Sequence, residues 1–310
     1  MFDIFQNTAR PDQNLFDRKN DVNDRRLGEI VSQSRYETSE VIILGCPQDE
    51  GVRRNGGRVG AALAPEAIRR QFYKLTPFGI SAKIFDAGDT IIQNSLEATH
   101  DLHTSIVRRI LHDGKKIIVL GGGNDISFAD GCAMASIYGA NDWLGINIDA
   151  HFDVRADEPR NSGTPYRQLL DGKLLLPKNF YEAAFQKQAA SPVYFEYLKN
   201  AGVNLISLDE FQVSNFKSRI KKQISGSPLS LFWGFDLDAV RASDAPGTSA
   251  PSPIGLSARE FCDLAEFAGS LPITRIVEFT EMNPKYDIDN RTARLVALAM
   301  HEFLSAVKKG

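Results

Sequence analysis

The sequence is poor in cysteine: three of its 310 residues are Cys, and no two of them form a CxxC pair. An odd number of widely separated cysteines indicates neither a zinc knuckle nor a disulfide framework. Isolated cysteines are typical of buried thiols in a reducing compartment. We therefore expect Cys46, Cys132 and Cys262 to be free thiols and the protein to be cytoplasmic.

Long hydrophobic runs and a dominant sign of charge are also missing. No apolar run approaches the ~20 residues that span a bilayer, and Asp3, Arg10 and Asp12 place charges where a signal peptide would be apolar. The 36 basic and 39 acidic residues give a formal net charge of −3, and neither sign dominates a long stretch. These absences argue against a membrane protein and against nucleic acid as a partner.

The composition favours a large core in one domain. Hydrophobic residues make up 43% of the chain, which is enough to bury a substantial core without disulfides. Residues 1–39 are polar and weakly patterned, and they predict an N-terminal arm packed on the outside of the fold. No internal repeat, low-complexity tract or long linker divides the remainder, so we expect a single domain over residues 1–310.

Beyond residue 40, short apolar runs alternate with amphipathic stretches. The predicted strands are Val41–Leu44, Lys83–Phe85, Lys116–Leu120, Leu144–Ile148, Val203–Ser207, Leu229–Phe235 and Thr274–Phe279. The predicted helices are Pro65–Leu75, Leu96–His112, Ile126–Tyr138, Tyr181–Asn200, Ser257–Gly269 and Asn290–Val307. Several strands are apolar without alternation, as expected for strands covered on both faces. Strands separated by helices indicate βαβ units, so we predict an α/β protein, a three-layer α/β/α sandwich with a mainly parallel central sheet.

Two strand ends carry groups of acidic residues. Asp149, His151 and Asp153 follow one predicted strand at alternate positions, which point the same way in an extended chain. Two carboxylates and an imidazole can ligate a divalent cation, although solvated acids at a strand end are the alternative. Asp236 and Asp238 follow another strand, where two acids repel each other unless a cation lies between them. Five such ligands exceed the need of one ion and favour a pair of ions.

A third strand ends in the glycine run Gly121–Gly123, followed by Asn124. Glycines permit tight turns and close approach of the backbone, so a phosphate-binding loop is an alternative. The run lacks both the GxGxxG spacing and the Lys-Ser/Thr of a P-loop, which argues against it.

Together, these stretches resemble the metal-binding motifs of the ureohydrolase (arginase–agmatinase) family: a glycine-rich turn ending in His, an Asp-Ala-His-x-Asp and an Asp-x-Asp. Residues 245–253 are similar to the family's proline- and glycine-rich segment, and Glu278-Phe-Thr-Glu281-Met-Asn283-Pro284 resembles its Glu-x-Asn-Pro. The resemblance covers about residues 40–305 and implies an arginase-like fold. Within the family, residues 49–58, 161–167 and 286–294 look like the formimidoylglutamase branch.

The resemblance implies a site for two Mn²⁺ ions. Its implied ligands are Asp149, His151, Asp153, Asp236 and Asp238, with Asp149 and Asp236 bridging the two ions. The family's glycine-rich turn normally supplies a His, but Asn124 stands here. A neutral amide oxygen suits Mn²⁺ but binds it more weakly, so we expect Asn124 to be a weak ligand and one of the two ions to be labile.

The resemblance also implies how a substrate would bind. Glu281 would hold its cationic amidine end, and the loop with Asn161, Ser162 and Thr164 would meet its amino-acid end. Arg155 and Arg167 are candidates to pair with a substrate carboxylate, although each could be a plain surface charge. Arginases and agmatinases place a His in this loop. Its absence here fits the formimidoylglutamase branch and leaves the acid for the leaving group unassigned.

The implied reaction is hydrolysis of N-formimidoyl-L-glutamate to L-glutamate and formamide, a late step of histidine degradation. A water held and acidified by two Mn²⁺ would attack the formimino carbon, while Asp153 would relay a proton to the departing amine. One alternative is a hydrolase of another guanidino or amidine compound, agmatinase- or guanidinobutyrase-like. The other is an inactive relative acting as a binding protein, which only Asn124 supports. Because family members usually assemble as homo-oligomers, we expect the same here.

Overall fold

The computed structural model describes residues 2–226 and 229–308, and the outermost residues of the expected 1–310 domain, 1, 309 and 310, lie outside them. One nine-stranded sheet runs through the molecule in the order β1-β3-β2-β4-β9-β8-β5-β6-β7. The strands are β1 Thr8–Ala9, β2 Val41–Gly45, β3 Ile84–Thr90, β4 Lys116–Leu120, β5 Trp143–Ile148, β6 Phe180–Phe185, β7 Asn204–Ser207, β8 Ser230–Asp236 and β9 Thr274–Thr280. All neighbouring strands pair in parallel except β1 with β3.

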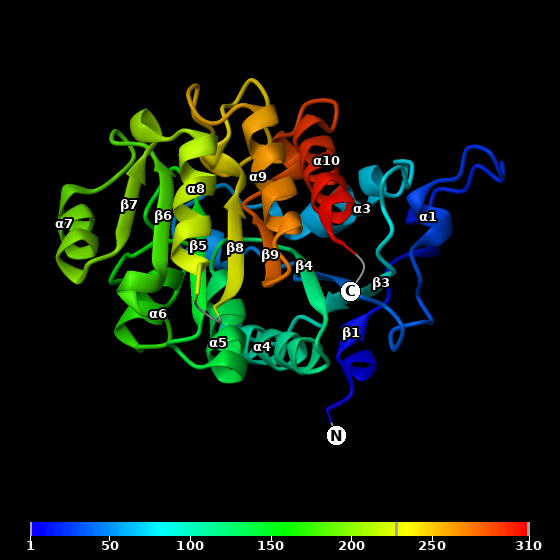
Figure 1. Cartoon of the computed structure of the whole chain (residues 1–310), viewed down its shortest axis with the longest axis horizontal. Helices are drawn as coiled ribbons and strands as arrows, with labels where there is room; N and C mark the ends of the chain where they lie inside the picture. The colour runs from blue at the N-terminus through cyan, green and yellow to red at the C-terminus, as the bar shows by residue number, and fades with distance from the viewer. Residues whose placement is uncertain (1, 227–228, 309–310) are drawn as a thin grey trace.

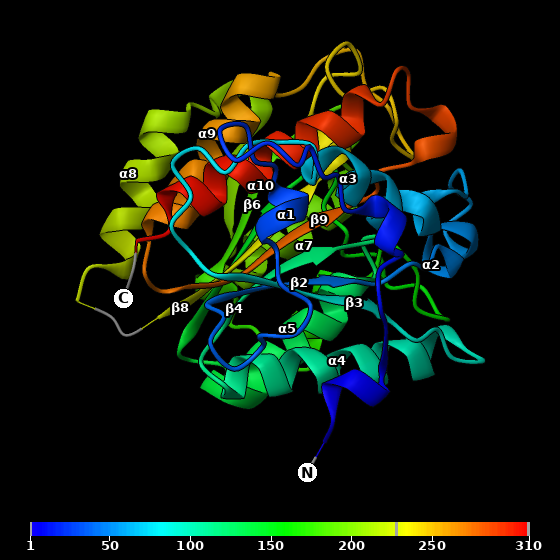
Figure 2. The same cartoon turned by 90° about the vertical axis from the view of Figure 1, so that its right-hand side faces the viewer.

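Helices cover both faces of this sheet. The α-helices are α1 Leu27–Ile30, α2 Glu50–Arg54, α3 Ala64–Phe72, α4 Leu96–His112, α5 Ile126–Tyr138, α6 Pro165–Asp171, α7 Pro192–Ala201, α8 Val213–Ile224, α9 Ala258–Ser270 and α10 Arg291–Ala306. Short 3₁₀ turns lie at Ile4–Gln6, Gln13–Leu15, Ala61–Leu63, Pro177–Asn179, Leu208–Glu210, Leu237–Ala239 and Pro284–Tyr286. In Figures 1 and 2, α3, α8, α9 and α10 lie above the sheet and α4 and α5 below it.

The strands are apolar without alternation because each contributes side chains to two cores. In β2, Val41 and Ile43 pack into the core under α3, α9 and α10, whereas Ile42 and Leu44 pack into the core over α4 and α5. Successive side chains of a strand point to opposite faces, so a strand buried on both faces must be apolar throughout. The predicted three-layer α/β/α architecture with a mainly parallel sheet is confirmed.

One predicted element is wrong. Residues 181–200 were expected to form a helix, but their first part belongs to strand β6, and helix α7 starts only at Pro192. Residues 181–191 contain good helix formers such as Glu182 and four alanines, and in the strand this local preference is overridden by burial between β5 and β7. Pro192 marked the boundary, because a proline inside one long helix would remove a backbone hydrogen bond, whereas at the first turn it is tolerated.

The N-terminal arm contributes to both cores, and its Phe16 ring stacks on Tyr73 at 4.3 Å between centroids. Strand β1 adds the single antiparallel edge, and this pairing was not predicted from the sequence. Among the helices of the described residues, none has the length and apolar character that crossing a membrane requires.

Candidate metal centre

The predicted ligands lie at the carboxyl ends of two neighbouring strands in the middle of the sheet. Asp149, His151 and Asp153 follow β5, while Asp236 ends β8 and Asp238 lies in the next 3₁₀ turn. Ligand sites in parallel sheets form at this edge because the loops that leave adjacent strands diverge there. Each leading aspartate also caps its own turn: Asp149 Oδ1 accepts from the His151 N–H at 2.7 Å, and Asp236 Oδ1 accepts from the Asp238 N–H at 2.9 Å.

Five side chains form two overlapping groups that suit divalent cations. One group is Asp149, His151 and Asp238, and the other is Asp149, Asp153 and Asp236; within each group, one ligand atom from every residue lies within 4.8 Å of the others. Carboxylate oxygens and an imidazole match the preferences of Mn²⁺. Asp149 belongs to both groups, so two ions bound here would share it.

The electrostatics point to cations as well. Burial raises the pKa of Asp236 well above its ordinary value, and the neighbouring carboxylates of Asp238 and Asp149 add to the effect. The same causes, burial followed by the charge of Asp149, raise the pKa of Asp153. The carboxylate of Asp238, 3.1 Å from Nδ1 of His151, is the main cause that raises the pKa of the imidazole to about 12. Positive charge placed among these groups would relieve the repulsion between the carboxylates.

A buried asparagine of the preceding strand holds the carboxylate of Asp149 in place. Asn147, which is fully buried in β5, donates from Nδ2 to Asp149 Oδ2 at 3.0 Å and lies 3.2 Å from an oxygen of Glu182 in β6. Hydrogen bonds to the outer atoms of a ligand fix its orientation. Asn147 therefore ties the shared carboxylate to the neighbouring strand.

Asn124 reaches the same centre from the turn after β4. Its amide nitrogen faces the carboxylates, 2.6 Å from Asp153 Oδ2, while its carbonyl oxygen accepts from the hydroxyls of Ser127 at 2.7 Å and Thr280 at 3.2 Å. An amide nitrogen only donates and an amide oxygen only accepts, so the contacts with Asp153, Ser127 and Thr280 together fix this orientation. Ligation through the carbonyl oxygen, as the sequence led us to expect, would require the amide to turn over.

Glu281 lies directly after β9, beside Asn124. Its Oε1 accepts from the Asn124 N–H at 2.9 Å, and its own N–H donates to Gly122 O at 2.9 Å. Burial raises the pKa of Glu281 to about 8. Glu281 and Asp153 both have left-handed backbones, with φ of 61° and 46°. A positive φ costs energy for a residue other than glycine, and such residues concentrate at functional sites.

Asn283, the asparagine of the Glu-x-Asn-Pro-like segment, holds the loops around Glu281 together. It is fully buried, its Nδ2 donates to Arg58 O at 2.7 Å, and its N–H donates to Gly247 O at 2.7 Å. The backbones at Arg58 and Gly247 are therefore both joined to Asn283, one through its side chain and one through its backbone N–H. The glycine- and proline-rich segment 245–253 thus serves to close the site beside Glu281.

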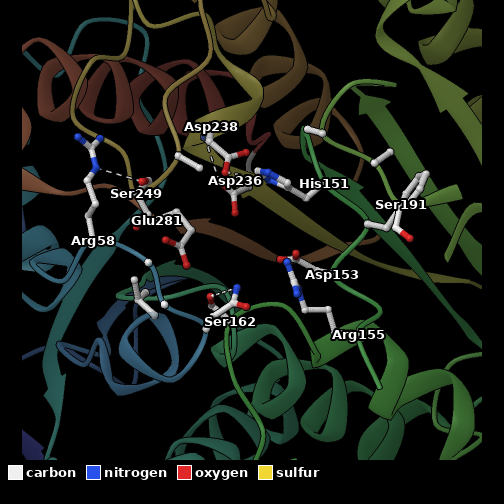
Figure 3. Close-up of a pocket in the computed structure, with 18 of the residues that line it drawn as sticks. Arg58, His151, Asp153, Arg155, Ser162, Ser191, Asp236, Asp238, Ser249 and Glu281 are labelled. Atoms are coloured by element: carbon white, nitrogen blue, oxygen red, sulfur yellow. Dashed lines mark hydrogen bonds and ion pairs between the residues drawn. The ribbon is translucent and has the colours of Figure 1, made fainter. Parts of the chain in front are cut away.

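A cavity of about 600 Å³ opens onto these residues (Figure 3). Two arginines line it, with Arg58 on one side beside Ser249 and Arg155 on the opposite side near Ser162. Ala189, Ala190, Ser191 and Tyr194, from the segment between β6 and α7 and from α7 itself, form part of the outer wall. A cavity of this size accommodates a small molecule in contact with the metal ligands.

Of the remaining residues predicted to bind the substrate, some line the cavity and others do not. Ser162 and Arg155 line the cavity. Asn161 and Thr164 are buried and bond each other within their own turn, with the Asn161 N–H donating to Thr164 Oγ1 at 3.1 Å. Arg167 lies on α6, where it pairs with Asp171 at 2.5 Å and stacks over Tyr197, and it is not among the residues that line the cavity.

The sequence interpretation assigned no role to several residues of the cavity, among them Asn55, Arg58 and Ser249. Asn55 and Arg58 lie within the segment 49–58, whose resemblance to one branch of a family assigns no role to either side chain. Ser249 lies in the proline- and glycine-rich segment. Both segments are loops, and nothing in their local pattern indicates which side chain faces the metal centre.

Comparisons with known proteins identify the family and the fold. The family model of the Arginase family matches residues 39–305. A formimidoylglutamase of Staphylococcus carnosus is 32% identical over 266 residues, which are 84% of this chain and 85% of that protein. A formimidoylglutamase of Rhodococcus opacus is 33% identical over 285 residues, 88% of each. The crystal structure of Trypanosoma cruzi formiminoglutamase with Mn²⁺₂ has a TM-score of 0.85 and 33% identity, and covers 91% of this chain and 98% of that chain.

Proposed function

The chain belongs to the arginase family, and from this premise we propose that it hydrolyses N-formimidoyl-L-glutamate to L-glutamate and formamide. The observation that carries the proposal is the pair of overlapping ligand groups that share Asp149 at the strand ends. The relatives named formimidoylglutamase, which are 32% and 33% identical to the chain over most of its length, support this substrate.

Two Mn²⁺ ions are the proposed cofactor. Asp149, His151, Asp153, Asp236 and Asp238 would hold them. Asp149 belongs to both ligand groups, whereas Asp236, the second bridging carboxylate that the family resemblance implies, belongs to one. Bound ions of this kind supply positive charge and make a water acidic enough to act as the nucleophile near neutral pH. Asn124 stands at the position where the family's motif has His and turns its amide nitrogen toward Asp153, so the ion on that side is proposed to be bound weakly.

The chain's own residues would bind and orient the substrate. Glu281, ionised in the complex, accepts hydrogen bonds from the protonated formimino group, which are stronger than bonds between neutral groups. Ser162 and Arg155 meet the amino-acid end of the substrate from the side of the cavity opposite Arg58. Asp153, the proposed ligand that lies beside Arg155 in Figure 3, would take a proton from the attacking water and pass it to the departing amine.

Release of L-glutamate from N-formimidoyl-L-glutamate is the test, measured with and without prior incubation in excess Mn²⁺. We expect hydrolysis that rises strongly with added Mn²⁺, because of the weak position beside Asn124. Absence of hydrolysis at every Mn²⁺ concentration would reject this substrate. A panel of guanidino compounds measured under the same conditions would then separate another ureohydrolase activity from an inactive binding protein.

The cellular setting is part of the proposal. The three cysteines are free thiols in the structure, which is typical of a reducing compartment such as the cytoplasm. Hydrolysis of N-formimidoyl-L-glutamate would place the chain in histidine degradation. Assembly as a homo-oligomer, usual in the family, is proposed by the same resemblance and can be measured by sedimentation.

A further inference from the structure

The stem of Arg155 lies across Gly163, and this is possible only because position 163 has no side chain. A Cβ built on Gly163 would lie 2.7 Å from Cδ and 2.9 Å from Nε of Arg155, closer than real Cβ contacts. The backbones of the two residues are joined as well, since the Arg155 N–H donates to Gly163 O at 2.8 Å. Gly163 is not among the glycines with positive φ. Space, and not backbone freedom, is therefore what this position requires.

The hydroxyl of Ser162 has a defined direction. Nδ2 of Asn55 donates to Ser162 Oγ at 3.1 Å, and this contact is drawn as a dashed line in Figure 3. Because an amide NH₂ group can only donate, Ser162 accepts here and keeps its own proton for another partner. Within residues 2–226 and 229–308, no hydrogen bond from that proton is found. The proton is therefore available to a molecule in the cavity.

The two arginines that line the cavity differ in how many contacts their guanidinium groups make with other residues of the protein. Arg58 donates to the carbonyl oxygens of Thr248 and Ser249 and stacks over the ring of Tyr286 at 3.9 Å. Among the ion pairs found within residues 2–226 and 229–308, which include those of Arg54 and Arg167, none involves Arg155. The side of the cavity that holds Arg155 thus offers donors, whereas the opposite arginine serves to fix a loop.

We propose that Asn55 and Gly163 are positioning residues that shape, with Arg155 and Ser162, a subsite for a carboxylate at the amino-acid end of the substrate. The inference deepens the proposed function and rests on it. Gly163 gives Arg155 the room to lie against the cavity wall, and Asn55 turns the Ser162 hydroxyl into a donor. A guanidinium and a hydroxyl donor together match a carboxylate, which only accepts.

This arrangement is a selection device for amino-acid amidines. A guanidino compound without a carboxylate would leave the Arg155 guanidinium and the Ser162 hydroxyl without a partner, and unmet polar groups are what make a polar pocket discriminate strongly. Both carboxylates of N-formimidoyl-L-glutamate have the required chemistry. The subsite takes one of them, and the experiment identifies which.

The test is a double-mutant cycle between Gly163→Ala and Arg155→Ala, read as kcat/KM for N-formimidoyl-L-glutamate. Each single variant is expected to lose about 10- to 100-fold, the range for a lost hydrogen bond to a charged group. In the Arg155→Ala background, Gly163→Ala should cost nothing further, because the displaced side chain is gone. If Gly163→Ala lowered kcat/KM as much in the Arg155→Ala background as in the wild type, Gly163 would have only a structural role and the inference would be overturned.

Two further readouts separate positioning from damage. Mn²⁺ affinity and the melting temperature should be unchanged in Gly163→Ala, because Gly163 contacts no metal ligand group. Gly172→Ala, at the end of α6 outside the cavity, is the matched glycine control and should leave kcat/KM unchanged. For Asn55, the Asn55→Ala loss should disappear in a Ser162→Ala background. Persistence of the loss would remove Asn55 from the subsite.

Analogues that lack one carboxylate identify the one that is bound. N-formimidoyl-4-aminobutyrate lacks the α-carboxylate, and N-formimidoyl-L-glutamine replaces the distal carboxylate with an amide. The analogue for which Gly163→Ala and Arg155→Ala no longer reduce kcat/KM lacks the carboxylate that the subsite binds. Undiminished losses with both analogues would contradict a carboxylate subsite.

Failure of the proposed function can be told apart from failure of the subsite. Binding of L-glutamate to the Mn²⁺-loaded chain, measured by calorimetry, does not depend on turnover. Binding that needs both Arg155 and Gly163 in a chain without hydrolytic activity would reject the substrate and keep the subsite. If the chain hydrolyses N-formimidoyl-L-glutamate but the effects of Gly163→Ala and Arg155→Ala simply add, the substrate is supported and the subsite is rejected. An L-glutamate affinity that is unchanged in both variants would also reject the subsite.

Discussion

Asp149 is the residue on which the proposed metal centre depends most. It is completely buried, it belongs to both ligand groups, and it is held by the His151 N–H and by Asn147. Asp153, by contrast, belongs to one group only. A shared ligand and an unshared ligand should therefore differ in how many ions their loss removes.

We expect Asp149→Asn to abolish binding of both Mn²⁺ ions, with apparent affinity falling by more than about 100-fold, because even outer contacts of a metal ligand account for 10–100-fold. Asp153→Asn is the matched control and should retain one ion. Equilibrium dialysis followed by metal analysis gives the number of ions per chain. Two ions retained in Asp149→Asn would show that this carboxylate is not shared.

The raised pKa of Glu281 leads us to predict how the stability of the metal-free chain changes with pH. Its pKa is about 8 in the fold against an ordinary value of 4.5, so the folded chain holds a proton that the unfolded chain releases. The stability that this proton provides is complete below pH ~4.5 and is lost as the pH rises toward ~8. In EDTA, Glu281→Gln should therefore lose less stability than the wild type between these limits.

Urea unfolding at several pH values measures this difference. Gln keeps an oxygen that can accept from the Asn124 N–H, so the substitution removes the titration and leaves the contact. The two proteins should have similar free energies of unfolding near pH 4.5, and the variant should be the more stable one above pH 8. Parallel curves for the two proteins would mean that Glu281 titrates normally.

At the scale of single residues, the sequence predicted which candidate ligands lie together but not how the side chains around them are oriented. Asp149, His151, Asp153, Asp236 and Asp238 were predicted as ligands because motif spacing at a strand end fixes which side chains converge, and the structure brings them together in two groups. The direction of the Asn124 amide depends on Ser127 and Thr280, and Thr280 lies 156 residues away in the chain. Contacts of such separation leave no local pattern.

Among the structural elements, the turn after β4 shows why a glycine run stands beside a metal centre. A Cβ on Gly122 would lie 1.6 Å from the carbonyl oxygen of Gln48, which is backbone and cannot move aside. A Cβ on Gly121 would instead meet the Cδ1 of Ile126 at 2.7 Å, the end of a flexible side chain. The turn passes close to the loop after β2, and it also accepts the N–H of Glu281 at Gly122 O.

We expect Gly122→Ala to lower the free energy of unfolding by about 3 kcal/mol, the upper end for forcing extra atoms into a packed interior. Gly121→Ala is the matched variant and should cost about 1 kcal/mol, because a side chain can adjust. Urea unfolding of both metal-free proteins gives the comparison. Equal losses in the two variants would contradict the close backbone contact as the reason for the second glycine.

Amphipathic period does not explain which helices were predicted, because α8 is strongly amphipathic and was missed, whereas α5 is hardly amphipathic and was predicted. Helices α4 and α5 have the predicted bounds, and a local signal marks one end of each, Ser95 as the N-cap of α4 and Gly139 at the end of α5. Helix α8 and strand β6 were missed, and β6 is covered on both faces, so neither alternation nor propensity marks it. Because the region of β6 was predicted as a helix, the outer wall of the cavity, which the residues after β6 help to form, could not be derived from the sequence either.

The whole molecule concentrates negative charge at the centre of its sheet. Strands β4, β9, β8 and β5 are consecutive neighbours, and their carboxyl ends and the residues that follow supply Asn124, Glu281 and the five candidate ligands. Burial raises the pKa of Asp149, Asp153 and Asp236, which means that the fold opposes their ionisation. Metal binding and folding are therefore coupled through the middle of the protein.

This coupling predicts a melting temperature that depends on Mn²⁺ concentration. A ligand that binds only the folded state stabilises it by about 2.7 kcal/mol at one hundred times its dissociation constant. We expect the melting temperature of the metal-free chain to rise with the logarithm of the free Mn²⁺ concentration, and the slope to become steeper once this concentration passes the dissociation constant of the weaker ion, the one nearest Asn124. Asp149→Asn should show no such rise, which separates specific binding from a general effect of salt. A wild-type slope that corresponds to one ion at every concentration would mean that only one position is occupied and would remove the two-ion site from the proposed function.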